Sequence, residues 1–187
     1  MEENIKDVVK EAYYLYKSGL VSGSAGNLSM RLNHEKIAIT PTRVPLSMVT
    51  EENVAIVDMD GRRLLGSEPS SELYLHLKIY KERDDINGIA HTHSPYATAF
   101  SFSNKKFNCL EGYSTTKNFM EEVEYHKPGS LELAEECAKK IKCADVLILK
   151  NHGIVSCASN LRKAVQLAEF VEETAKIQFI AYILNKV

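Results

Sequence analysis

The chain has 187 residues, of which 44% are hydrophobic and 26% are charged, and its formal net charge is -2. These values are ordinary for a globular protein and give no reason to expect nucleic acid as a partner. No run of about 18 apolar residues occurs and the N-terminus lacks an apolar signal core, so we expect a cytoplasmic protein with no membrane span. The length suits one well-buried domain over residues 1–187.

Hydrophobic periodicity and turn residues divide the first half of the chain into short elements. Apolar residues either recur at helical spacing or follow the pattern of a strand, and glycine, proline and Asp60-Gly61 separate the segments. In chain order we predict a helix over 4–18, strands over 28–31, 36–40, 53–59 and 62–65, a helix over 71–83, and a strand over 86–93.

The second half of the chain continues this alternation. Residues 102–129 carry the weakest pattern, and we expect two short strands there, around Tyr113 and Val123. Around them we predict helices over 94–101 and 131–142, strands over 145–149 and 153–157, and a long closing helix over 161–184. Short strands, hairpins and interspersed helices predict an α/β fold class, as a three-layer α/β/α domain with a largely antiparallel central sheet.

Two histidines in the strand predicted over 86–93 are spaced like metal ligands. His91 and His93 are two residues apart, so in a strand both imidazoles face the same side. His152, in a turn between two apolar runs, offers a third imidazole. Three neutral imidazoles suit a borderline-soft divalent ion and leave one coordination position open for water or substrate. Because buried imidazoles without partners cost free energy, we interpret the pattern as a catalytic metal site.

Three polar segments each have an ordinary and a functional interpretation. Pro69-Ser70-Ser71-Glu72 is a helix start with a capping serine and an acidic residue at the helix dipole, or a phosphate site with a glutamate base beside a metal. Gly23-Ser24-Ala25-Gly26-Asn27 is a turn, or a loop that binds an anion. Thr40-Pro41-Thr42 is a plain loop or a hydroxyl donor. His76 we interpret as a core residue or as support for the site.

In their order along the chain, these segments resemble the class II sugar-phosphate aldolase family, to which the L-fuculose-1-phosphate aldolase type and the related L-ribulose-5-phosphate 4-epimerases belong. Each piece is short, but five pieces in the right order, spread over roughly residues 5–180, make the resemblance specific. The matching pieces are residues 23–31, 39–42, 69–72, 91–95 and 151–153.

The resemblance implies a metal-dependent active site. It implies a zinc ion on His91, His93 and His152, with Glu72 beside it as the base that removes or returns the proton of the enediolate carbon. It also implies a site for the substrate phosphate, formed by Ser24, Asn27, Thr42, Arg43, Ser70 and Ser71. Arg43 departs from the pattern, because the aldolases usually have glycine there, and it either adds a guanidinium to this site or points away.

The resemblance further implies a homotetramer with active sites at subunit contacts. In the family a tyrosine of a neighbouring subunit donates a proton, and Tyr113 lies near that position in the sequence. The chain also lacks the C-terminal tail that contributes a tyrosine to the site in longer members.

The implied activity is reversible cleavage of a ketose 1-phosphate, of the L-fuculose 1-phosphate type, to dihydroxyacetone phosphate and a small aldehyde such as lactaldehyde. The epimerases carry an aspartate in place of Glu72 and need a longer chain, which favours aldol cleavage here. The methylthioribulose-1-phosphate dehydratases also carry a glutamate and are the main alternative. A non-catalytic metal- or carbohydrate-binding module is the alternative of another class, disfavoured because all three histidines and the glutamate are present.

Overall fold

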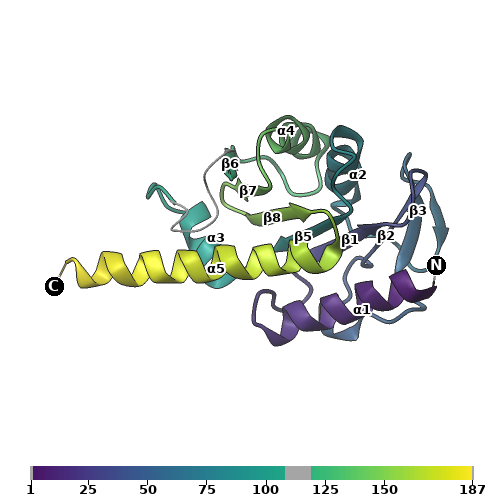
Figure 1. Cartoon of the computed structure of the whole chain (residues 1–187), viewed down its shortest axis with the longest axis horizontal. Helices are drawn as coiled ribbons and strands as arrows, with labels where there is room; N and C mark the ends of the chain where they lie inside the picture. Colours follow the sequence, from purple (N-terminus) through teal and green to yellow (C-terminus); the bar gives the residue numbers. More distant parts are fainter. Residues whose placement is uncertain (1, 108–118, 187) are drawn as a thin grey trace.

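The computed structural model describes residues 2–107 and 119–186, and its centre is an eight-stranded sheet (Figure 1). The strands are β1 (Asn27–Arg31), β2 (Lys36–Ile39), β3 (Ala55–Asp58), β4 (Arg63–Leu65), β5 (Gly88–Thr92), β6 (Met120–Val123), β7 (Val146–Leu149) and β8 (Gly153–Ala158). Across the sheet their order is β4-β3-β2-β1-β5-β8-β7-β6. Neighbouring strands are antiparallel except β6 and β7, which are parallel.

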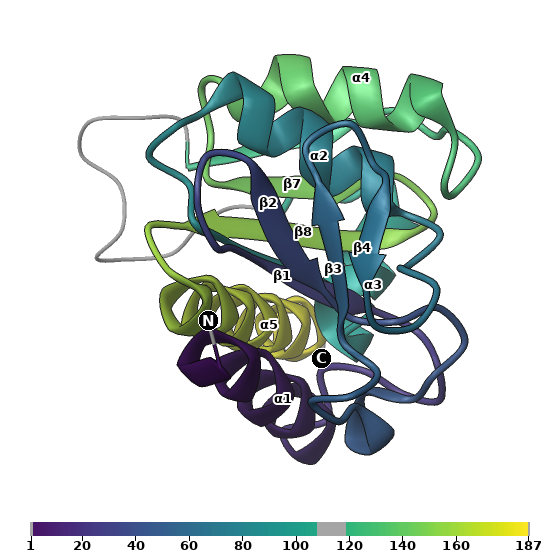
Figure 2. The same cartoon turned by 90° about the vertical axis from the view of Figure 1, so that its right-hand side faces the viewer.

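Helices cover both faces of the sheet, as Figure 2 shows. They are α1 (Glu2–Lys17), α2 (Leu73–Glu82), α3 (Pro95–Ser101), α4 (Leu131–Ile141) and α5 (Leu161–Leu184), with a short 3-10 helix, η1 (Leu46–Met48). Helices α2 and α4 pack on one face, while α1, α3 and α5 pack on the other. The predicted three-layer α/β/α fold with a largely antiparallel sheet is therefore confirmed.

Side-chain alternation along the strands feeds both layers. In β7, Leu147 and Leu149 belong to the core under α2 and α4, whereas Val146 and Ile148 belong to the core under α3 and α5. This is the two-residue period of a strand buried on both faces. In the same way β5 turns Ile89, and with it His91, toward the α2 side of the sheet.

Two element ends differ from the prediction, and both lie at the site. Helix α2 begins at Leu73, so the segment 69–72 precedes its first turn. Strand β5 ends at Thr92, so His93 lies just beyond it. The strand ends here because α3 begins at Pro95. Ser94, which the proline holds extended, links the two elements. The 3-10 helix η1 was not predicted. Of the two strands expected in 102–129, the one near Val123 is β6, and Tyr113 lies outside the described residues.

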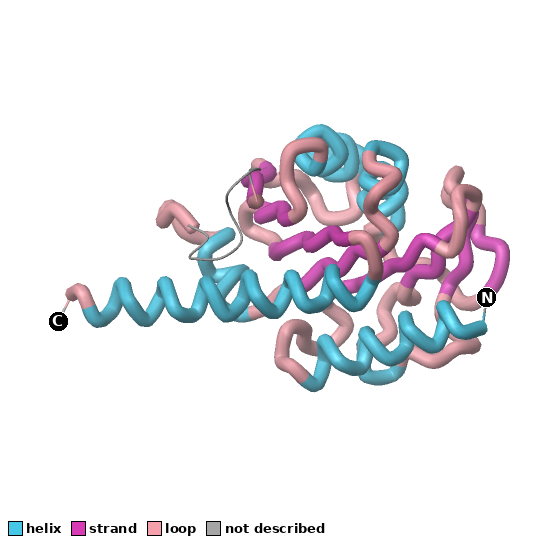
Figure 3. Tube along the Cα trace, in the orientation of Figure 1, coloured by secondary structure: helices cyan, strands magenta, loops and turns pink. Residues whose placement is uncertain are grey.

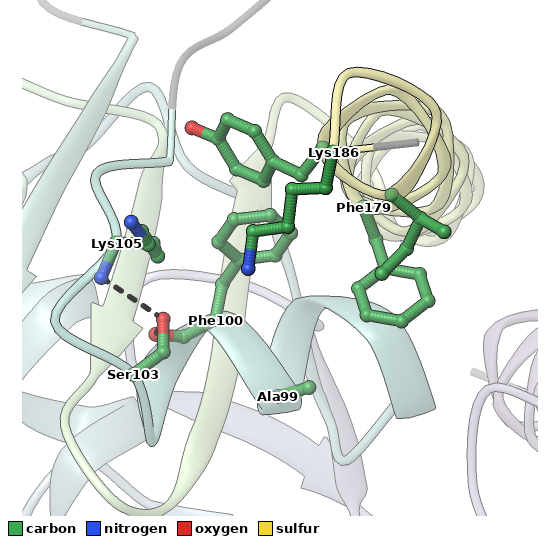
Figure 4. Close-up of a pocket in the computed structure, with 8 residues that line it drawn as sticks. Ala99, Phe100, Ser103, Lys105, Phe179 and Lys186 are labelled. Carbon is green, nitrogen blue, oxygen red and sulfur yellow. Dashed lines mark hydrogen bonds between the residues drawn. The ribbon is translucent and has the colours of Figure 1, made fainter.

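The far half of α5 extends beyond the sheet (Figures 1 and 3). Several apolar side chains there are half exposed, among them Phe179 and Ile183. Together with α3 they form a pocket of about 250 Å³ (Figure 4). Its lining residues are Ala99, Phe100, Ser103, Lys105, Phe179, Tyr182, Ile183 and Lys186. Among the described helices, none is both long enough and apolar enough to cross a membrane.

Candidate metal centre and active site

The three histidines singled out in the sequence lie together. His91 is in β5, His93 follows that strand, and His152 directly precedes β8, the antiparallel neighbour of β5. One ring nitrogen from each can be chosen so that all three lie within 4.8 Å of one another, and the Nε2 atoms of His91 and His93 are 2.9 Å apart. His91 is fully buried and His152 is 8% exposed. The strand register thus joins residues that are sixty positions apart.

Backbone features hold the imidazoles in this arrangement. The Nδ1–H of His91 donates to the carbonyl of Ile154 across the sheet at 2.9 Å, which turns Nε2 toward the other two rings. Asn151 adopts a left-handed conformation with φ 55°, which makes the sharp turn before His152. A Cβ on Gly153 would lie 2.5 Å from the carbonyl oxygen of Thr92, so only glycine fits at this crossing.

The electrostatics of the cluster suit a cation. Burial lowers the pKa of His93 to about 3 and that of His152 to about 4, so both rings are neutral near pH 7. For His91, burial would lower the pKa, but the carboxylate of Glu72 outweighs burial and raises it. Positive charge is therefore favoured between His91 and Glu72, and a proton or a metal ion can supply it.

Unpaired polar atoms point to the same conclusion. Within residues 2–107 and 119–186, His152 Nδ1 and Glu72 Oε1 are buried without a hydrogen-bond partner. Buried polar atoms are rarely left unpaired, and three imidazoles with an adjacent carboxylate match the donor set of a catalytic divalent ion. The residues present therefore fit a divalent metal ion.

The carboxylate of Glu72 lies next to the three-histidine cluster. Its Oε2 is 3.1 Å from His91 Nε2 and its Oε1 is 3.5 Å from His152 Nε2. Burial alone would raise the pKa of Glu72, but the imidazoles of His91 and His152 and a hydrogen bond from Asn27 outweigh it and hold the pKa well below its ordinary range. The carboxylate is therefore ionised and able to accept a proton.

Two loops of the predicted phosphate site, residues 40–42 and 68–71, are linked by backbone hydrogen bonds just before Glu72. Ser70 N–H donates to the carbonyl of Thr40 at 3.1 Å, and Thr42 N–H donates to the carbonyl of Glu68 at 3.0 Å. These bonds align the segments 40–42 and 68–71, so the two segments that carry Thr42, Ser70 and Ser71 run side by side. Backbone N–H groups and hydroxyls gathered before a helix are the groups that bind phosphate.

Of the other predicted phosphate ligands, Arg43 and Ser24 lie in two turns, whereas Asn27 begins β1 and its amide contacts Glu72 and His76 instead. Arg43 is exposed and has a φ of 59°, which explains why glycine is usual at this position in the aldolases. Ser24 is exposed in the turn before β1. A Cβ on Gly26 in this turn would lie 2.9 Å from the carbonyl oxygen of His91, so the turn passes close to the histidine cluster. Tyr113, the predicted proton donor, lies outside the described residues.

Sequence reasoning did not find a group of buried hydrogen bonds behind Glu72. Asn27 donates to Glu72 Oε2 at 2.9 Å, and its Oδ1 is 2.6 Å from His76 Nε2. Ser29 Oγ is 2.7 Å from His76 Nδ1 and 2.9 Å from the hydroxyl of Tyr80. The spacing in the sequence was compatible with this group, because Glu72, His76 and Tyr80 recur every four residues. Asn27 and Ser29 are likewise two residues apart. The hydrogen bonds could not be predicted without knowing that α2 packs beside β1.

The fold and the site together define a member of the class II aldolase group. The chain belongs to the family described as "Class II Aldolase and Adducin N-terminal domain", whose model matches residues 6–179. It is 40% identical over 180 residues to the L-fuculose phosphate aldolase of Methanococcus maripaludis strain C5, covering 95% of this chain and 96% of the relative.

Other relatives carry a different activity in their names. The chain is 36% identical over 170 residues to the 3-oxo-tetronate 4-phosphate decarboxylase of Haemophilus influenzae, covering 88% of this chain and 81% of the relative. Among solved structures, an L-fuculose 1-phosphate aldolase is 31% identical and superposes with a TM-score of 0.85, over 98% of this chain and 88% of that one. The relatives to which this chain is similar are thus named both as aldolases and as a decarboxylase.

Proposed function

We propose that this protein catalyses the zinc-dependent, reversible cleavage of a ketose 1-phosphate of the L-fuculose 1-phosphate type. The products are dihydroxyacetone phosphate and a small aldehyde such as lactaldehyde. The observation that carries the proposal is the buried carboxylate of Glu72, which lies 3.1 and 3.5 Å from two imidazoles of the three-histidine cluster. A base adjacent to a metal site is the arrangement that removing a proton next to a carbonyl requires.

The residues divide the work between binding and proton transfer. Thr42, Ser70 and Ser71, with Ser24 and Arg43 in the adjoining turns, bind the phosphate and so fix the reacting carbons against Glu72. Glu72 then takes the proton in the synthesis direction and returns it in the cleavage direction. A divalent ion held by His91, His93 and His152 would act as a Lewis acid that polarises the carbonyl of the substrate. Tyr113 of a neighbouring subunit is proposed to protonate the aldehyde oxygen.

Zinc is the metal that the ligand set supports best, because three neutral imidazoles and one open position suit it. Metal analysis of the purified protein is expected to give one zinc ion per chain. Chelation should abolish activity and added Zn²⁺ should restore it. Activity that survives complete removal of metal would contradict the proposed role of the histidines.

Proton exchange is the sharpest test of the reaction type. Incubated alone with the protein in D₂O, dihydroxyacetone phosphate should exchange one C–H proton, and adding an aldehyde should yield a ketose 1-phosphate. Water loss from a methylthioribulose phosphate without this exchange would instead assign a dehydratase. If the protein turns over no phosphate compound and still binds these compounds, it is a binding module.

Decarboxylation is a second candidate function, favoured by the relative that carries this activity in its name. Loss of CO₂ from a 3-oxo acid phosphate also leaves negative charge beside a carbonyl, so the same histidines would serve it. Unlike aldol addition, the synthesis direction of the first proposal, it needs no base to remove a carbon-bound proton. Release of CO₂ from a 3-oxo-tetronate 4-phosphate, with no exchange on dihydroxyacetone phosphate, would establish this function.

We further propose that residues 1–187 form a single domain of a cytoplasmic homotetramer with active sites at the subunit contacts. The half-exposed apolar side chains of α5, such as Phe179 and Ile183, would then be covered by another subunit. Sedimentation should give four times the chain mass of 21.0 kDa. A monomer at assay concentrations would contradict the assembly.

A further inference from the structure

A line of buried hydrogen bonds runs away from the metal site, between α2 and β1. From Tyr80 it passes through Ser29, His76 and Asn27 to Glu72, with heavy-atom distances of 2.9, 2.7, 2.6 and 2.9 Å. Tyr80, Ser29 and His76 have no exposed surface, and Asn27 and Glu72 are each 6% exposed. These five side chains therefore find their partners almost entirely within the protein.

The line forms because α2 and β1 place these side chains at nearly equal intervals. Glu72, His76 and Tyr80 recur every four residues along α2, which advances them by about 6 Å each time on one face of the helix. Asn27 and Ser29 are two residues apart in β1, which advances them by about 6.6 Å on one face of the strand. The two repeats nearly match, so the strand side chains alternate with the helix side chains.

The direction of the hydrogen bonds is determined by the carboxylate at one end. Ionised Glu72 can only accept, so the amide nitrogen of Asn27 faces it and the amide oxygen faces His76. His76 must then donate from Nε2, which leaves Nδ1 to accept from the hydroxyl of Ser29. Ser29 in turn accepts from Tyr80. No other assignment satisfies every buried group.

His76 holds Asn27 from the side opposite Glu72. Asparagine has a donor and an acceptor of nearly the same shape, and the Nε2–H of His76 binds the amide oxygen in the same orientation that presents N–H to Glu72. Burial lowers the pKa of His76 to about 3, so the ring is neutral and keeps one donor and one acceptor near pH 7. Without this donor, the amide oxygen of Asn27 would be left unpaired in the interior.

We propose that His76 is a positioning residue, which through Asn27 holds the carboxylate of Glu72 by its Oε2 and leaves Oε1, which lies 3.5 Å from His152 Nε2 and accepts no hydrogen bond from the described residues, to act as the base. The proposal rests on the proposed function to the extent that Glu72 is the base of that reaction. Among the described residues, the hydrogen bonds of His76 go to Asn27 and Ser29 and to no member of the three-histidine cluster, so His76 would act on Glu72 only through Asn27.

Two substitutions at His76 separate positioning from packing. Glutamine places its amide where Nε2 of histidine lies and can still donate to Asn27, whereas asparagine reaches only as far as Nδ1 and loses that bond. We expect H76Q to stay within about threefold of the wild-type kcat and H76N to lose about 10- to 100-fold, the usual range for a residue that orients a site residue. The expected loss is in kcat, with KM and zinc content nearly unchanged.

Two further variants serve as controls. I79V alters another fully buried side chain of α2 outside the hydrogen-bonded line and should leave kcat unchanged. In the E72Q background, H76N should cause little further loss, because residues that act through one another are not additive. Equal losses in H76Q and H76N, multiplying losses with E72Q, or loss of zinc in H76N would each overturn the proposal.

A spectroscopic measurement tests the same point without any reaction. In ¹⁵N-labelled, chelator-treated protein, His76 should appear as the neutral Nε2–H tautomer between pH 6 and 8, with H76N serving to assign the signal. A neutral Nδ1–H tautomer or an imidazolium would overturn the proposal even in an active enzyme. If the tautomer is as expected but no aldol chemistry is found, the proposed function fails and the positioning of Glu72 by His76 stands.

Discussion

Helices α2 and α4 pack side by side on the same face of the sheet, yet their first turns differ. Helix α4 begins in the ordinary way, because the hydroxyl of Ser130 accepts from the N–H of Leu133 at 3.2 Å and the exposed Glu132 lies near the positive end of the helix dipole. At α2 the capping position is held by Glu72, and no side-chain cap is present among the described residues.

The difference indicates that α2 lacks the stabilisation that a capping side chain gives to α4. A capping side chain contributes about 1 kcal/mol to stability, and at α2 the carboxylate is turned toward His91 instead. The two helix starts also touch, since a Cβ on Gly129 would lie 2.9 Å from the carbonyl oxygen of Ser71. The regular start of α4 thereby packs against the irregular start of α2 and helps to hold it.

Removing the carboxylate at each helix start should separate their roles most strongly. E72Q keeps the size of the side chain but removes the base, and we expect kcat to fall by about 100-fold or more with zinc retained. E132Q, at the start of α4, is the matched control and should leave kcat unchanged. Steady-state kinetics with metal analysis would measure both. A near-normal rate in E72Q would show that Glu72 is not the base and serves only as a residue at the start of α2.

Ser70, before α2, should affect activity, whereas Ser130, before α4, should affect only stability. Ser70 is predicted to bind the substrate phosphate, so S70A should raise KM by about tenfold, as expected for the loss of a hydrogen bond to a charged group. Its effect on stability should be small, because its hydroxyl accepts only one long bond of 3.3 Å from the N–H of Glu72. An unchanged KM would remove Ser70 from the phosphate site.

The buried titratable residue of α2 should make stability depend on pH. His76 has a pKa of about 3 when folded, against an ordinary value of about 6.5 when unfolded. As the pH falls below about 6.5, the unfolded chain binds a proton that the folded chain does not, so stability is lost. The largest slope from one such group is about 1.4 kcal/mol per pH unit.

Urea unfolding of the metal-free protein at pH 7 and pH 5 would measure this dependence. The wild type should lose more stability over that interval than H76Q, which has no group to titrate at this position. Equal losses in the two proteins would show that His76 is not held neutral in the folded state.

The smallest effect is expected at the cap of α4. S130A removes the bond to Leu133 N–H and should lower the free energy of unfolding by about 1 kcal/mol, while kcat and KM stay as in the wild type. Denaturant unfolding, followed by far-UV circular dichroism, would show the shift. A loss of activity larger than the loss of stability would mean that α4 takes part in the site more directly than its contacts indicate.

The sequence alone determined the helices and strands of this protein and its three-histidine cluster. Periodicity placed all the helices and strands of the described residues apart from η1, because local spacing is enough to indicate which face of an element is buried. The spacing of His91 and His93, with His152 in its turn, likewise predicted the cluster that the structure contains. Their short motifs carried the family resemblance, which the family match confirmed.

The tertiary structure alone decided how the carboxylate is held. The side chains of Asn27 and His76 are 49 positions apart in the chain, and they meet only because α2 crosses β1 at one register. The pairing of Asn27 with His91 across β1 and β5 brings this line of hydrogen bonds to the metal site. Local propensity does not encode such contacts, since they depend on strand pairing and helix packing summed over the whole core. The same reason explains why the sequence singled out Glu72, His76 and Asn27 but did not predict the hydrogen bonds that join them.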